Sequence, residues 1–98
     1  MIVALLRLEL RLHDATSLKD KRSAIKRLTA DLKRLNCAVA EVDHQDLRQR
    51  ATLAVVTVAN ERFHARKVLH EAERLAERGD GVELLGGDVS EYGPDDDE

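Results

Sequence analysis

Residues 2–12 read Ile-Val-Ala-Leu-Leu-Arg-Leu-Glu-Leu-Arg-Leu, and this stretch decides the fold. Every even-numbered position is apolar, whereas Arg7, Glu9 and Arg11 stand at odd-numbered positions. Side chains alternate between the two faces of a β-strand, so the pattern predicts one long strand with an apolar face toward the core and a mixed face opposite. Because charges interrupt the run, we expect neither a secretory signal sequence nor a membrane-spanning segment.

A helix is predicted next, over residues 18–36. Ser17 and Asp20 have the spacing of a capping box, in which a hydroxyl and a carboxylate satisfy free backbone N–H groups at the start of a helix. Apolar residues recur at helical spacing and would form one stripe against the core: Leu18, Ile25, Leu28, Leu32 and Leu35.

Two apolar stretches then predict strands at 37–42 and 51–59, joined by a polar connection. A second helix is expected from its cap Asn60 to about residue 78, with these residues facing the core: Phe63, Val68, Leu69, Ala72, Leu75 and Ala76. A last strand is expected at 82–89, where Gly86-Gly87 marks a bulge or a bend.

The order strand, helix, strand, strand, helix, strand predicts an α+β fold, the ferredoxin-like βαββαβ sandwich. Two right-handed crossovers would place both helices on one face of an antiparallel four-stranded sheet. The chain has 98 residues, and we expect one domain over residues 1–92 and an acidic disordered tail at 93–98. The single cysteine, Cys37, excludes an intramolecular disulfide and any zinc site that needs a cysteine pair, and we expect a cytoplasmic protein.

Charge is distributed unevenly, although the net charge is only −3. Between positions 19 and 34 there are seven basic residues against two acidic ones, while from Asp88 onward there are six acidic residues and no basic one. A basic helix can follow the phosphates of a nucleic acid, but an ordinary solvated helix face has the same composition. The predicted nucleic-acid-binding residues are Lys19, Lys21, Arg22, Lys26 and Arg27.

The polar connection holds the most varied chemistry. Asp43 and Asp46 flank His44, and such a group could hold a metal ion or transfer a proton. Successive residues of an extended segment point to opposite sides, however, and the other histidines have no ligand spacing. We therefore predict no catalytic residue, metal site or cofactor, and instead hydrogen-bonding residues that shape a hairpin and an interaction surface: Asp43, His44, Gln45, Asp46, Arg48, Gln49 and Arg50.

Two stretches carry a resemblance to a known family. Ser-Leu-Lys-Asp-Lys-Arg (17–22) and Val-Ala-Glu-Val-Asp-His-Gln-Asp-Leu (39–47), followed by Gln-Arg-Ala (49–51), resemble the YlxP-like family of small bacterial proteins, domain of unknown function 503. Arg48 stands where members usually carry tryptophan, so no stacking role is carried over. The resemblance covers about residues 1–90 and implies a ferredoxin-like fold. It also implies a translation setting, since family genes commonly lie near those for translation and ribosome-maturation factors.

Three hypotheses of function remain open. The first is a non-enzymatic binding protein associated with ribosomal RNA or a translation-related protein, reading RNA by backbone and shape because base-stacking aromatics are missing. The second is a homo-oligomeric structural or regulatory module, which binds a protein partner or its own copy through the open sheet face beside Val3 and Leu5. The third is a metal-dependent hydrolase centred on His44. No membrane partner is expected.

Overall fold

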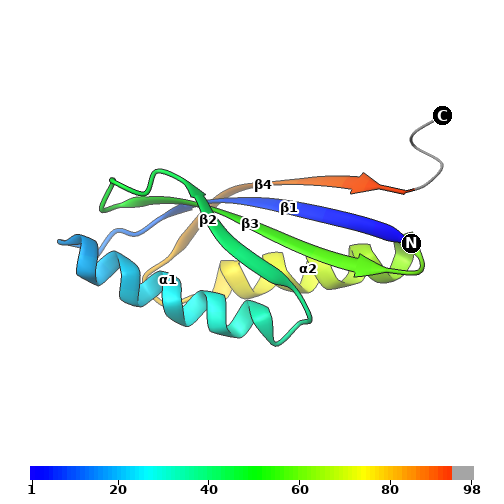
Figure 1. The fold of residues 1–98 in the computed structure, drawn as a ribbon. Helices are drawn as coiled ribbons and strands as arrows, with labels where there is room; N and C mark the ends of the chain where they lie inside the picture. Colours follow the sequence, from blue (N-terminus) through cyan, green and yellow to red (C-terminus); the bar gives the residue numbers. More distant parts are fainter. Residues whose placement is uncertain (94–98) are drawn as a thin grey trace.

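Six elements of secondary structure form in the computed structural model, which describes residues 1–93. They follow in the predicted order: β1 (Ile2–Arg11), α1 (Leu18–Lys33), β2 (Ala38–Asp43), β3 (Arg50–Ala59), α2 (Arg62–Arg78) and β4 (Glu83–Tyr92). The strand order is β2-β3-β1-β4, every neighbouring pair is antiparallel, and both helices lie on one face of the sheet (Figure 1). The predicted α+β ferredoxin-like fold is confirmed. The predicted tail lies outside the described residues, apart from Gly93.

The core lies between the sheet and the two helices. The even-numbered residues of β1 are buried, as predicted, and they pair with residues of β3 on the same face. Leu6, for example, is opposite Val55, and both are fully buried. Leu32 of α1 and Leu69 of α2 cover this layer from the helix side and are at most 1% exposed. No helix of residues 1–93 lies on the other face of the sheet, which we call the open face.

One predicted core residue is exposed. Phe63 is 69% exposed, so the prediction that it faces inward is wrong. The buried residues of α2 recur at intervals of four and three, and Phe63 lies two positions before the first of them, on the opposite side of the helix. These buried residues are Ala65, Leu69, Ala72 and Ala76. Within residues 1–93, no helix is long and apolar enough to cross a membrane.

Several boundaries differ from the predicted ones. Helix α1 ends at Lys33, and Asn36 follows with a left-handed φ of 64°, so the chain turns earlier than predicted. The N-cap of α2 is Glu61 rather than Asn60, and its side chain makes no capping hydrogen bond. Strand β4 continues to Tyr92. Its irregularity lies beside the glycine pair, because the register with β1 skips Leu85.

Glu91 ties the end of β4 to α2. Its carboxylate accepts hydrogen bonds from Arg66 Nε at 2.6 Å and from Arg62 Nη1 at 3.2 Å. The hydrogen bond from Arg66, helped by Arg62 and by both positive charges, lowers the pKa of Glu91. A carboxyl group with a lowered folded-state pKa stabilises the fold above its unfolded pKa, and this contribution is lost as the pH falls through the folded pKa.

We therefore expect Glu91→Gln to flatten the acid side of the stability curve. The variant should be less stable than the parent at neutral pH, and the difference should shrink as the pH falls below the unfolded pKa of a glutamate, about 4.3, and through the lowered folded-state pKa of Glu91. Denaturation in urea at several pH values measures this. Asp88→Asn is the control, because Asp88 lies on the same strand and has no ion pair within residues 1–93. A loss that stays constant down to pH 3 would contradict the expectation.

Candidate functional site

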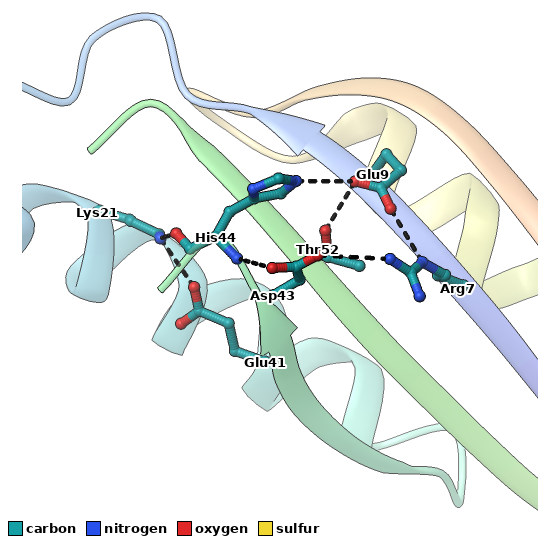
Figure 2. Close-up of polar contacts among 7 residues, drawn as sticks. All are labelled: Arg7, Glu9, Lys21, Glu41, Asp43, His44 and Thr52. Carbon is teal, nitrogen blue, oxygen red and sulfur yellow. Dashed lines mark hydrogen bonds and ion pairs between the residues drawn. The ribbon is translucent and has the colours of Figure 1, made fainter. Parts of the chain in front are cut away.

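The two sequence stretches that resemble the family meet in space through Lys21. Its Nζ donates a 2.6 Å hydrogen bond to the backbone oxygen of His44 and lies 2.8 Å from Glu41 Oε2 (Figure 2). The contact with Glu41 is an ion pair without hydrogen-bond alignment, since that oxygen has no hydrogen-bond partner within residues 1–93. Lys21 is 2% exposed. The first turns of α1 are therefore fastened to β2 and to the loop after it.

Lys21 is not accessible to a nucleic acid, although it is one of the predicted nucleic-acid-binding residues, because its side chain is buried. Lys21 lies in the buried stripe of α1 with Ile25, Leu28 and Leu32, and its ammonium group is already held by Glu41. The sequence carried a signal for this, because Lys21 stands four positions before Ile25 and seven before Leu28. These are the spacings of one helix face.

A second group of polar side chains covers part of the open face. Glu9 accepts a 2.7 Å hydrogen bond from Thr52 Oγ1, and Arg7 Nε lies 3.1 Å from its other carboxylate oxygen. Arg7 also lies 3.8 Å from Asp43, and His44 Nε2 lies 4.0 Å from Glu9 (Figure 2). Thr52 is fully buried although it belongs to the open face. Polar side chains therefore cover Thr52 and this end of the open face.

His44 has a left-handed backbone conformation, with φ of 61°. Its N–H donates a 2.8 Å hydrogen bond to Asp43 Oδ1, and its carbonyl accepts from Lys21 and from the N–H of Leu47. Such a φ is uncommon outside glycine, and local hydrogen bonds of this kind help to hold it. The stretch after Asp43 is not extended, so the predicted alternation of sides does not apply to it.

Glu9 is an acceptor rather than a proton donor in this group. Burial raises the pKa of its carboxyl, but hydrogen bonds from Thr52 and Arg7, with the charges of Arg7 and His44, outweigh that effect and lower the pKa. Within residues 1–93, no group of three or more His, Cys, Asp or Glu side chains could hold a metal ion. The metal site that the hydrolase hypothesis requires has no geometric support in this part of the chain.

Two residues of the predicted interaction surface tie the β2–β3 loop to the connection between β1 and α1. Arg48 Nη1 donates to the backbone oxygen of Thr16 at 3.1 Å. Gln49 Nε2 donates at 3.3 Å to the backbone oxygens of both His13 and Ala15. These contacts show hydrogen bonding that shapes the loop. They leave the Arg48 side chain exposed beside the first turn of α1.

The remaining residues of that surface differ from one another. Gln45 Nε2 donates to the backbone oxygen of Glu41 at 3.3 Å. Asp46 is exposed, and its side chain makes no hydrogen bond or ion pair within residues 1–93. Arg50 has a buried Nε without a hydrogen-bond partner in the described chain. Sequence reasoning missed Glu9 and Thr52, since they lie in strands β1 and β3 and not in the polar connection between residues 43 and 50.

The exposed cations of α1 gather mainly along one flank. Successive spacings of three, four and seven residues place four of them in one row along a helix, and we call this row the basic stripe: Lys19, Arg22, Lys26 and Lys33. None of the four forms an ion pair within residues 1–93. Arg22, Lys26 and Lys33 line a groove that Glu41 of β2 also lines. Arg27 lies on the other flank, toward Arg78 of α2.

Several solved structures share the fold. The de novo designed protein Foldit4 has a TM-score of 0.56 at 11% identity, covering 95% of this chain and 98% of that one. SnoaB, a cofactor-independent oxygenase from Streptomyces nogalater, has a TM-score of 0.51 at 12% identity, covering 94% and 91%. The designed protein LFR1 1, described as having a ferredoxin fold, has a TM-score of 0.50 at 13% identity, covering 94% and 84%. At these identities the likeness shows the fold alone.

Sequence comparison gives a family. The chain is 36% identical over 59 residues to "Uncharacterized protein YlxP" of Bacillus subtilis (strain 168), a match that spans 59% of this chain and 64% of that protein. The family model described as "Protein of unknown function (DUF503)" matches residues 3–88, which include Lys21, Glu41, His44 and the basic stripe. The chain therefore belongs to the DUF503 family, whose function is not known.

Proposed function

We propose that this protein is a non-enzymatic binding protein that holds the phosphate backbone of RNA along α1. The observation that carries the proposal is the basic stripe, whose four cations are exposed and form no ion pair with the rest of the described chain. Unpaired cations in a row can displace the counterions that surround a nucleic acid. The release of these counterions is the main source of sequence-independent affinity. Arg48, which is exposed and donates a hydrogen bond to the carbonyl of Thr16 just before α1, is a further cation on the loop after β2.

Contact with the backbone rather than with bases fits the distribution of aromatic residues. A recognition-motif sheet stacks bases on aromatics of its central strands, but the open face of β1 and β3 carries Val3, Leu5, Ala54 and Val56. The chain's only aromatics, Phe63 and Tyr92, lie on α2 and β4. We therefore expect low sequence specificity and a strong dependence on salt.

A binding role also agrees with the chemistry of the polar group on the open face. The Glu9 carboxylate is engaged by Thr52 and Arg7, and the ammonium group of Lys21 is engaged by Glu41 and the His44 carbonyl. A catalytic acid or base must reach a proton of the substrate. These groups already have hydrogen-bond or ion-pair partners within the protein, so we assign them a role in shaping the surface.

Reversing two charges of the stripe is expected to weaken RNA binding and its salt dependence. Arg22→Glu together with Lys26→Glu should lower the slope of log affinity against log salt by about 1.4, because each contact with a single strand contributes about 0.7. Fluorescence anisotropy with labelled oligouridylate at several salt concentrations measures the slope. The matched control is Lys67→Glu with Arg74→Glu, two exposed cations of α2 that give the same change in net charge. Equal losses in both double variants would mean that only net charge matters and would reject the stripe as the site.

The translation setting, which comes from the family resemblance, needs a separate experiment. The purified protein should co-sediment with ribosomal subunits or their assembly intermediates at low salt and be released as salt rises. Retention on one kind of particle that is lost as salt rises would identify that particle as the partner. Absence from every particle at low salt would contradict the ribosomal part of the proposal.

A further inference from the structure

Both edges of the sheet lack a neighbouring strand within residues 1–93, and they differ in how open they are. Strands β2 and β4 form the two edges. Strand β4 carries the irregularity at Leu85 next to Gly86, and natural proteins use such bulges to make an edge unsuitable for further pairing. Strand β2 is regular from Ala38 to Glu41, with its own irregularity only at Val42.

The regular part of β2 carries no proline and no lysine, two residues that protect natural edge strands. Natural edges are blocked by proline, by lysine or by inward-pointing charges. Ala38, Val39 and Ala40 are small or β-branched, and the one charge, Glu41, is neutralised by Lys21. Ala38 and Ala40 are exposed. An antiparallel edge strand presents alternate N–H and C=O groups outward, so β2 offers a short row of hydrogen-bonding groups.

The groove beside this edge is basic. Arg22, Lys26 and Lys33 line it together with Ile25, Thr29 and Glu41. A strand added to β2 would send every second side chain toward the helix layer, with a repeat of about 6.7 Å. Arg22 and Lys26 are four residues apart, which corresponds to about 6 Å along the helix axis. Acidic residues at alternate positions of an added strand would therefore come opposite these cations.

The same charges disfavour a second copy of this chain at the β2 edge. Pairing β2 with β2 of another copy about a two-fold axis would bring the two basic stripes side by side, and like charges at short range oppose association. RNA satisfies the cations but supplies few donors for the outward carbonyl groups of β2. An acidic peptide supplies carboxylates for the cations and both donors and acceptors for the edge.

We propose that the free edge of β2 accepts an extended acidic segment of a protein partner as a fifth strand, with its carboxylates directed toward Arg22 and Lys26. Such strand addition derives its affinity from main-chain hydrogen bonds and its specificity from the alternate side chains. It goes beyond the binding of RNA, because it uses the backbone of β2 as well as the basic stripe.

Amide hydrogen exchange of the intact protein, followed by NMR, tests the inference. The probe is the capped octapeptide Thr-Glu-Val-Glu-Val-Glu-Val-Thr, and the same peptide with lysine in place of glutamate is its control. At a concentration about ten times the dissociation constant, the acidic peptide should slow exchange about elevenfold at alternate amides of Ala38–Asp43 and leave those on the outer edge of β4 unchanged. Arg22→Glu with Lys26→Glu should weaken peptide binding by about tenfold, and Lys67→Glu with Arg74→Glu should not.

The outcomes separate this inference from the RNA proposal. Binding of oligouridylate but not of the acidic peptide would overturn strand addition and leave the RNA proposal standing. Binding of the peptide without protection of β2 amides would also overturn it, since the contact would then be one of charge alone. Equal binding of the acidic and lysine peptides would reject the role of Arg22 and Lys26. Protection of the β2 amides without any binding of RNA would support strand addition and reject the RNA proposal.

Discussion

Replacement of Lys21 by methionine is expected to lower the free energy of unfolding by about 2 to 3 kcal/mol, because it leaves a partly buried carboxylate without its partner. Methionine keeps the apolar stem of a side chain that is 2% exposed, so the loss reports the ammonium group. That group is 2.8 Å from Glu41 Oε2 and 2.6 Å from the oxygen of His44. In a domain of this size the melting temperature should fall by roughly 10 to 20 °C.

Thermal and urea denaturation measure the effect, and a second variant separates the charge from the packing. In Lys21→Met with Glu41→Leu, no buried carboxylate is left unpaired, so most of the loss should be recovered. Lys26→Met is the matched control on the same helix, since Lys26 is exposed and forms no ion pair within residues 1–93. It should change stability by about 0.5 kcal/mol or less. A Lys21 variant as stable as the Lys26 variant would show that the contact with β2 is not structural.

The fold could be predicted because two patterns leave few alternatives. The alternation in residues 2–12 and the apolar run at 51–59 define the two central strands, and helical spacing defines the face of α1 that packs on them. Boundaries were less determined, because neighbouring polar residues compete for the same capping role. Asn60 has the better capping side chain, but α2 begins one residue later, after Glu61.

The candidate site could be predicted only in part, for a physical reason. Sequence spacing shows that Lys21 shares a face with Ile25, but it cannot show that Glu41 of another element meets its ammonium group there. His44 likewise combines a left-handed backbone with a hydrogen bond from Lys21 to its carbonyl, and spacing in the sequence cannot show that contact. The two family-like stretches are therefore in contact with each other in the fold, through side-chain contacts that involve no ligand.

Comparison of two single variants, Leu6→Ala and Leu5→Ala, tests which face of the sheet is buried. Leu6 is fully buried under the helices, so its truncation should cost about 3 to 4 kcal/mol through lost contacts and the cavity left behind. Leu5 is its neighbour in β1 and lies half-buried on the open face. In a monomer, the same truncation there should cost about 1 kcal/mol or less, because only part of the side chain is removed from water. Urea denaturation of both variants measures the contrast.

The Leu5 variant also decides whether the open face binds a second copy of the chain. Val58 and Tyr92, on the same face near Leu5, are each 55% exposed, and burial of this region would give a dimer an apolar centre. A dimer would make the melting temperature of the parent rise with protein concentration, and Leu5→Ala would reduce that rise. The RNA and strand-addition proposals place their ligands on α1 and β2, and neither requires a second copy at the open face. We therefore expect a melting temperature independent of concentration and a monomer mass in light scattering. A rise that Leu5→Ala abolishes, with Leu6→Ala retaining it, would instead assign the open face to self-association.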